Sequence, residues 1–166
     1  MTLAITTTFT LAENSLVPLT IVHAEETADD SQAFSFKDSL IVTKSPYSVK
    51  TTGKRLELVL MERGFTIFNR IDHAAGANSV GEQLRPTQVI IFGNPRVGTL
   101  LMQCQQSVAI DLPQKALIWQ NEQGQVQLAY NNPQYLVARH QISGCDQVVE
   151  NIEKALAAIV KETVER

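Results

Sequence analysis

The sequence predicts an α+β fold with two layers, an antiparallel sheet with helices on one face, and three observations support this prediction. Short runs of strand-forming residues are separated by turn residues along most of the chain. One amphipathic helical pattern follows the first of these runs, and a longer one closes the chain. Strands joined by short turns pair antiparallel, and two such helices need one sheet face to cover. The predicted element order is β-α-β-β-β-β-α.

The chain divides into an N-terminal extension, residues 1–38, and a single α+β domain, residues 39–166. The segment 22–26, VHAEE, resembles a signal-peptidase site, but the basic region of a signal peptide is missing. The extension is therefore interpreted as a decayed signal peptide or a flexible tail, and localisation stays open between cytoplasm and periplasm. The longest apolar stretch, 16–24, is shorter than the ~20 residues of a membrane span. No membrane span is expected.

The domain is predicted to begin with a strand in which the β-prone run 40–42 is followed, after an irregularity at Pro46, by Tyr47 and Val49. A helix comes next, because Ser48 can cap it and apolar residues then recur every three or four positions. Gly53 lies inside this helix and weakens it by roughly 1 kcal/mol relative to Ala. Gly64 stands where a left-handed residue is expected to end it.

Two strands are predicted in the middle of the domain. Residues 65–71 alternate, with Ile67 and Asn69 on the same face. Residues 74–81 are small and are expected to form a short helix or a loop. Residues 88–92 contain four consecutive apolar side chains, which indicates a central, buried strand.

The last part of the chain is predicted to hold a hairpin and two helical segments. Strands at 115–120 and 125–130 flank a turn at 121–124. A short helical segment follows, and then a long terminal helix with a broad apolar face.

Several sequence blocks, in the same order, resemble the bacterial and archaeal family called domain of unknown function 302. The blocks are SPYSV at 45–49, RIDHAAGA at 70–77, LRPT at 84–87, IFGNP at 91–95, IDLPQKALIW at 110–119 and YNNPQYLVARH at 130–140. The resemblance covers residues 39–142 and implies the same β-α-β-β-β-β-α order, similar to the fold of TATA-box-binding protein. It implies no biochemical activity, because the family has none agreed. Relatives look like homodimers, so self-association is expected.

Composition argues against nucleic-acid binding despite that fold. The 166 residues carry 17 acidic and 14 basic side chains, a net charge of −3, and the basic residues form no dense run. Nucleic-acid binders concentrate Lys and Arg on one face to neutralise phosphates. No nucleic-acid partner is expected.

Asp72 and His73, at the end of a predicted strand, form the first candidate site. A carboxylate near an imidazole can set its tautomer and raise its basicity. Adjacent strand residues point to opposite faces, however, so Asp72 is not expected to orient its own neighbour. The alternative interpretation is a turn aspartate beside a hydrogen-bonded histidine.

The segment 93–99, GNPRVGT, is the second candidate. Its glycine spacing imitates a phosphate-binding loop, but Thr99 stands where the essential lysine belongs. Nucleoside triphosphate binding is therefore not predicted. Asn94 and Pro95 are favourable residues for a helix start. The backbone amides of this segment, assisted by Arg96, are a candidate anion site.

Arg85, Arg139 and His140 form the third candidate group, suited to bidentate recognition of a carboxylate or phosphate. The alternative is a helix end at which Arg and His complement the helix dipole. Asp111, within IDLP, is interpreted as a turn residue that bonds to the backbone. No metal site is predicted, because His73 and His140 lack the local spacing of a ligand set.

The two cysteines, Cys104 and Cys145, lack a CxxC motif or a nearby histidine. The sequence neither establishes nor excludes a disulfide, and two unpaired thiols are the favoured interpretation. Serine or cysteine nucleophile chemistry is not predicted either, since no GxSxG motif and no evident activating base is present.

The leading hypothesis is a homodimeric module without catalytic activity. It binds a small ligand, with an anionic one as a candidate, or a protein partner, through the sheet face and the loops ending in His73, Asn94 and His140. The alternative is a hydrolytic or metal-assisted enzyme that uses Asp72, His73, Arg85 and His140. A third hypothesis is a purely structural dimer. The ligand and any cofactor stay unknown.

Overall fold

The computed structural model describes residues 39–165, in which five strands form one antiparallel sheet. The strands are β1 (Leu40–Ser45), β2 (Thr66–Asp72), β3 (Thr87–Gly93), β4 (Gln114–Gln120) and β5 (Val126–Asn131). Their order across the sheet is β1-β5-β4-β3-β2, and every neighbouring pair is antiparallel. The predicted α+β class is confirmed. The predicted extension, residues 1–38, lies outside the described residues.

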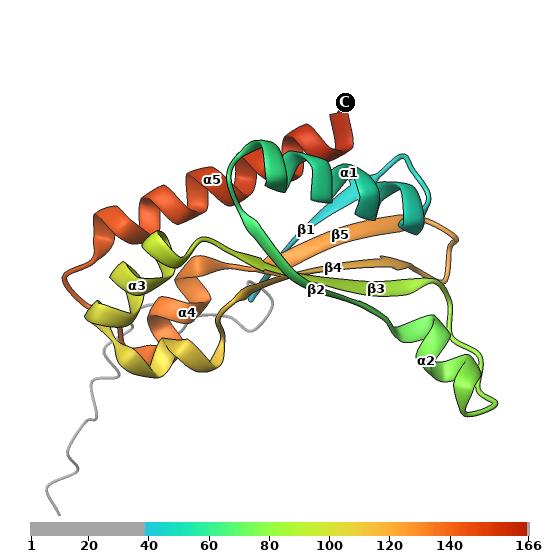
Figure 1. Cartoon of the computed structure of the whole chain (residues 1–166), viewed down its shortest axis with the longest axis horizontal. Coiled ribbons are helices and arrows are strands. Elements are labelled where there is room, and N and C mark those ends of the chain that lie inside the picture. The colour runs from blue at the N-terminus through green and yellow to red at the C-terminus, as the bar shows by residue number, and fades with distance from the viewer. Residues whose placement is uncertain (1–38, 166) are drawn as a thin grey trace, which may run out of the picture. The chain divides into compact units, whose positions relative to one another are not determined.

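Two long helices, α1 (Val49–Glu62) and α5 (Asp146–Glu165), lie side by side over one face of the sheet (Figure 1). The shorter helices are α2 (His73–Ser79), α3 (Pro95–Cys104) and α4 (Pro133–His140), and a 3₁₀ turn, η2 (Gln106–Ile110), follows α3. Figure 1 shows α2 projecting from one end of the sheet, with α3 and α4 at the opposite end. The predicted β-α-β-β-β-β-α order is therefore confirmed, with α2 and α3 inserted between strands and α4 inserted between β5 and α5.

The core lies between the sheet and these two long helices, because alternate strand residues point toward them. Core residues come from α1, β4, β5 and α5, and include Leu56, Val59, Leu60, Ile118, Leu128, Leu156 and Ile159. On β3, Ile90 and Phe92 are buried in this core, whereas Val89 and Ile91 are only partly buried and reach the other face. β3 is thus an interior strand, as predicted, but only every second residue of its apolar run enters the core.

The far face of the sheet, turned away from α1 and α5, carries an apolar row that crosses all five strands. The strand register aligns one residue from each strand, in the order Val42, Ala129, Leu117, Val89 and Ile71. Val42 is 50% exposed and Ile71 is 38% exposed, at the two edges of the sheet. Among residues 39–165, no helix combines the length and apolar character that crossing a membrane requires.

Polar caps begin four of the helices. Ser48, Asp72, Asn94 and Asn132 precede α1, α2, α3 and α4, and each side chain accepts a hydrogen bond from a first-turn backbone N–H. Gly64 follows α1 with a φ of 73°, the left-handed conformation predicted for it.

Two local features differ from the prediction. The first strand was predicted to resume after Pro46 with Tyr47, but β1 ends at Ser45, and α1 begins at Val49 after a short turn. In β2 the register shifts at a bulge, so that Ile67 pairs with Phe92 while Asn69 pairs with Ile91. Asn69 therefore lies on the far face and does not share a face with Ile67. A simple alternation count cannot anticipate an inserted bulge residue.

A disulfide joins Cys104, the last residue of α3, to Cys145, which immediately precedes α5, with their Cα atoms 6.3 Å apart. The interpretation of two unpaired thiols is wrong in this structure. The pairing arises because α3 packs against α5, a tertiary contact that leaves no local motif in the sequence.

Candidate functional site

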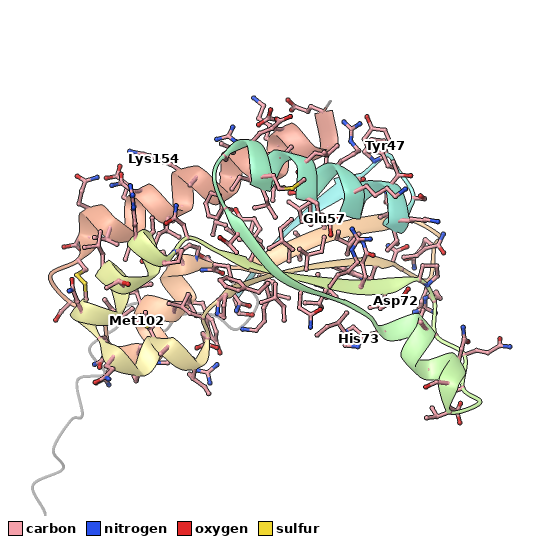
Figure 2. The ribbon with its side chains drawn as sticks, viewed as in Figure 1. Tyr47, Glu57, Asp72, His73, Met102 and Lys154 are labelled. Atoms are coloured by element: carbon pink, nitrogen blue, oxygen red, sulfur yellow. A yellow bond between two sulfur atoms is a disulfide. The ribbon has the colours of Figure 1, made fainter. Side chains whose placement is uncertain are left out.

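Three of the predicted site residues lie at the end of the sheet from which α2 projects. Asp72 and His73 are found where β2 meets α2 (Figure 2). Asp72 caps the helix, with its Oδ1 accepting a hydrogen bond from the Ala75 N–H at 2.9 Å, and His73 is exposed. Arg85 precedes β3 at this same end and donates from Nε to the Gln120 carbonyl at 3.2 Å. The Asp72 side chain thus caps α2, a role that neither interpretation of Asp72 named.

The other four predicted residues lie beyond the opposite end of β3. Asn94 and Arg96 begin α3, whereas Arg139 and His140 end α4. β3 contains seven residues, which at about 3.3 Å each separate the two ends by ~20 Å. The structure therefore does not bring His140 into a common site with the three residues at the α2 end.

His140 is the centre of a hydrogen-bonded cluster that connects α4 to η2. Its Nε2 lies 2.6 Å from Asp111 Oδ2, and its Nδ1 lies 3.0 Å from Ser107 Oγ. Arg139 Nη1 is 3.3 Å from Asp111 Oδ1, so both carboxylate oxygens have a partner. The side chains of His140 and Asp111 are 7% and 14% exposed, and Ser107 is exposed. We call these four residues the His140 cluster.

Asp111 was interpreted as a turn residue that bonds to the backbone. It does end the turn η2, but the structure shows its carboxylate bonded to side chains. Its carboxylate bonds to two side chains of α4, because α4 packs against η2, the turn that immediately precedes Asp111. That contact joins residues nearly thirty positions apart in the chain, and turn chemistry alone does not reveal it.

A cavity of about 370 Å³ opens between α3, α5 and the adjacent part of the sheet. Its walls are almost entirely apolar and include Phe65, Phe68, Leu101, Met102 and Leu156. Met102 is marked in Figure 2 at the α3 end of the molecule. The volume falls within the roughly 300–1,000 Å³ of typical small-molecule sites. Size and lining are therefore those of a binding site for a small apolar compound.

Gln114, the first residue of β4, is one of the few polar residues in this wall. It is 8% exposed, and its Oε1 is buried with no hydrogen-bond partner among the described residues. A buried carbonyl left unpaired costs about 1–3 kcal/mol. Such a group in an apolar wall is able to accept a hydrogen bond from a molecule that brings its own donor.

Sequence reasoning missed Ser107 and Gln114 as site residues. Ser107 belongs to a polar stretch that matches no nucleophile motif, and no sequence signal identifies it. Gln114 was detectable in part, because strand alternation places it on the same buried face as Ala116 and Ile118. A glutamine at such a position indicates a buried amide that needs a partner.

Two ionisable groups elsewhere have shifted pKa values. A hydrogen bond from Lys154, together with its charge, lowers the pKa of Glu150 on the exposed side of α5. Burial raises the pKa of Tyr130, and the nearby charge of Glu153 raises it further. Neither group belongs to the His140 cluster or lines the cavity. Within residues 39–165, no group of three His, Cys, Asp or Glu side chains is arranged to hold a metal ion.

The family model described as "Domain of unknown function DUF302" matches residues 41–159, most of the domain. The chain belongs to this family. The crystal structure of an uncharacterized conserved DUF302 protein from Bacillus stearothermophilus has a TM-score of 0.68 and 21% sequence identity to it. That match covers 75% of this chain and 97% of the other, so the two proteins share the DUF302 fold.

Curated relatives of this DUF302 chain carry the name of a channel. "Fluoride-specific ion channel FluC 1" of Brucella suis biovar 1 (strain 1330) is 42% identical over 103 residues, 62% of this chain. The protein of the same name from Brucella abortus biovar 1 (strain 9-941) has the same identity over the same length. The match spans only 41% and 38% of those proteins. The DUF302 chain therefore covers about two-fifths of the curated relatives, and the channel name belongs to those longer proteins.

Proposed function

We propose that this DUF302 domain binds a small, largely apolar molecule that carries one hydrogen-bond donor, in the cavity between α3 and α5. The observation that carries the proposal is Gln114 Oε1, a buried acceptor that has no hydrogen-bond partner among residues 39–165 and lies in a largely apolar wall. Buried polar atoms in folded proteins nearly always have a partner, so a ligand donor at this position supplies a contact that the chain lacks.

The remaining walls determine the chemical class of the ligand. Phe65, Phe68 and Met102 offer aromatic and thioether surface, which suits a flat aromatic or aliphatic ring system. A phenol, an alcohol or an amide N–H provides the required donor. An anionic group on the ligand stays a prediction from the sequence, with exposed Arg96 in the first turn of α3 as its candidate partner.

Calorimetric titration with two matched probes tests the binding mode. 1-Naphthol and 1-methoxynaphthalene have the same ring system, but only the first donates a hydrogen bond. A net hydrogen bond of about 0.5–1.5 kcal/mol predicts that the full-length protein binds the naphthol roughly 2 to 10 times more tightly. Gln114→Met keeps the side-chain length and removes the acceptor, so it should abolish the preference while both probes still bind.

Substitutions of two alanines in α5 test whether the probes bind in this cavity. Ala155 lines the cavity, whereas Ala157 lies exposed on the same helix. Ala155→Phe should fill the cavity and prevent binding of both probes, and Ala157→Phe should leave both affinities unchanged. Equal binding by both variants, or no binding by the unmodified protein, contradicts the proposal.

We also propose that two copies associate through the apolar row on the far face of the sheet. The row is uncharged and runs from one edge strand to the other, with Val42 half exposed at its end. A two-fold axis through the row places each copy's row on the other's, and no charge in it is left unpaired. A second copy is therefore the favoured occupant of this face, in agreement with the homodimer that the sequence resemblance implied.

Sedimentation equilibrium of the full-length protein tests the dimer. Val42→Glu introduces a charge into the row, and Leu58→Glu introduces one on α1, at a side chain that is similarly exposed, 54% against 50%. The unmodified protein and Leu58→Glu should sediment as dimers, and Val42→Glu as a monomer. A monomeric unmodified protein, or a dimer that survives Val42→Glu, refutes this interface.

A further inference from the structure

We propose that the His140 cluster is a catalytic site in which Ser107 acts as a nucleophile that cleaves small carboxylic esters by acyl transfer. This activity goes beyond ligand binding in the cavity and rests on different atoms, since neither Ser107 nor His140 lines that cavity. The two proposals therefore stand or fall separately.

The tautomer of His140 follows from its partners. An ionised carboxylate only accepts hydrogen bonds, so at 2.6 Å from Asp111 Oδ2 the ring Nε2 must carry the proton. In the neutral ring, Nδ1 is then an unprotonated acceptor, and the Ser107 hydroxyl at 3.0 Å must donate to it. That is the ground state a serine nucleophile needs, with its proton already directed at a base.

The cluster is also held in place. Asp111 is fixed through both oxygens, by His140 on one side and by Arg139 on the other. The disulfide adds a covalent link, because Cys104 ends α3 shortly before η2, and Cys145 ends the loop that joins α4 to α5. Such support preserves the alignment on which nucleophile activation depends.

The base and the nucleophile of the cluster differ in exposure to solvent. The His140 side chain is only 7% exposed, while Ser107 is exposed, so the base is shielded and the nucleophile faces outward. In a 3₁₀ helix residues three positions apart lie above one another, which places Ile110 on the Ser107 side of η2. Ile110 is 73% exposed. It offers apolar contact beside the nucleophile, which favours esters with an apolar acyl group.

The reaction balances with the groups present. Ser107 Oγ attacks the ester carbonyl carbon and forms the acyl–oxygen bond, while its proton passes to His140 Nδ1. The carbon–oxygen bond to the alcohol breaks, and the alcohol leaves with that proton. Water then attacks the acyl-serine, gives a proton to Nδ1, and the carboxylic acid departs as the Ser107 hydroxyl recovers the proton. Asp111 stabilises the imidazolium that forms in each half-reaction.

The arrangement matches the serine, histidine and aspartate triad in its roles but exchanges the two ring nitrogens. Here Nε2 faces the carboxylate and Nδ1 faces the serine. Because either imidazole nitrogen can accept the proton, the exchange leaves the chemistry intact. A triad is recognised by geometry and roles, so the absence of a GxSxG motif does not oppose it.

The experiment treats the folded, disulfide-bonded full-length protein with a fluorophosphonate probe and, separately, with p-nitrophenyl butyrate. The probe should attach to Ser107, which peptide mass spectrometry identifies, and the ester should be hydrolysed with a burst. Ser107→Ala should lower hydrolysis by on the order of 10²–10⁴-fold and abolish labelling. Asp111→Asn leaves the shape of the cluster intact. It should slow ester hydrolysis and probe labelling by similar factors. Circular dichroism checks that the variants fold.

Ser143 supplies the matched control, because it is an exposed serine in the loop that follows α4. Ser143→Ala should leave labelling and hydrolysis as they are in the unmodified protein. Labelling of Ser143 and Ser107 to the same extent overturns the proposal. So does hydrolysis by Ser107→Ala at the unmodified rate, since a general surface effect then explains the activity. Failure of Gln114→Met to change naphthol binding bears only on the cavity.

Discussion

Gly53 should tolerate alanine only when Gln88 is removed. Gly53 lies in the interior of α1, where glycine costs about 1 kcal/mol relative to alanine, so propensity alone predicts that Gly53→Ala stabilises the protein. The structure predicts the opposite. A Cβ at this position would lie 1.9 Å from Gln88 Nε2, far inside the contact distance.

The magnitude follows from what Gln88 does. It is 6% exposed and donates from Nε2 to the Val49 carbonyl at 3.1 Å. Displacing the amide breaks this bond and leaves buried polar groups unpaired, at about 1–3 kcal/mol. Subtracting the gain of about 1 kcal/mol in helix propensity leaves a net destabilisation of roughly 1 kcal/mol for Gly53→Ala.

Urea denaturation of a double-mutant cycle measures the effect. In the Gln88→Ala background the obstacle is gone, so Gly53→Ala should raise the free energy of unfolding by up to about 1 kcal/mol. The two backgrounds then differ by about 2 kcal/mol, well above the 0.3–0.5 kcal/mol within which independent sites add. Additive effects, or stabilisation by Gly53→Ala alone, would refute the reasoning.

Three further predictions concern stability. Gln114→Met should raise the free energy of unfolding of the ligand-free protein by about 1–2 kcal/mol, seen as a higher Tm, because an unpaired buried carbonyl is removed; a lower Tm contradicts this. Burial raises the pKa of Tyr130 above 10.0, so its stabilising contribution is present below that pH and is lost as the pH rises further. Urea denaturation between about pH 9 and 11 should therefore show a steeper loss than in Tyr130→Phe, and parallel curves argue against it. The disulfide between Cys104 and Cys145 closes a loop with a separation of 41 residues. Loop entropy predicts a loss of about 4 kcal/mol in the double serine variant, and unchanged urea midpoints with and without reductant would contradict it.

Much of the fold follows from local patterns. Alternation and apolar runs identified the strands, and Ser48 and Asn94 identified helix starts, because these signals depend on neighbouring residues only. The bulge in β2 was not predicted, since an inserted residue leaves the alternation of side chains intact on either side of it. The disulfide was not predicted either, because it depends on how α3 packs against α5.

The candidate site shows the limit of such patterns more sharply. Arg139 and His140 drew attention as cations at a helix end, and Asn94 as a cap, and all three lie at the end of the sheet that holds the cavity and the His140 cluster. Asp72 and His73 drew equal attention, yet they lie about one strand length away. Residues with reactive or charged side chains can be recognised in the sequence by type. Which of them lie close together is decided by the order of the strands in the sheet.

The sequence by itself determined the fold class and the order of the main elements, because hydrophobic periodicity and capping residues act over a few positions. The resemblance to the DUF302 family came separately, from its sequence blocks. Only the tertiary structure decided that Ser107, Asp111 and His140 form one hydrogen-bonded chain. It alone also left Gln114 with a buried oxygen that has no hydrogen-bond partner within the described part of the chain, in a largely apolar cavity. The physical reason is that hydrogen-bond partners and cavities arise where elements distant in the chain pack together, and no local pattern records that packing.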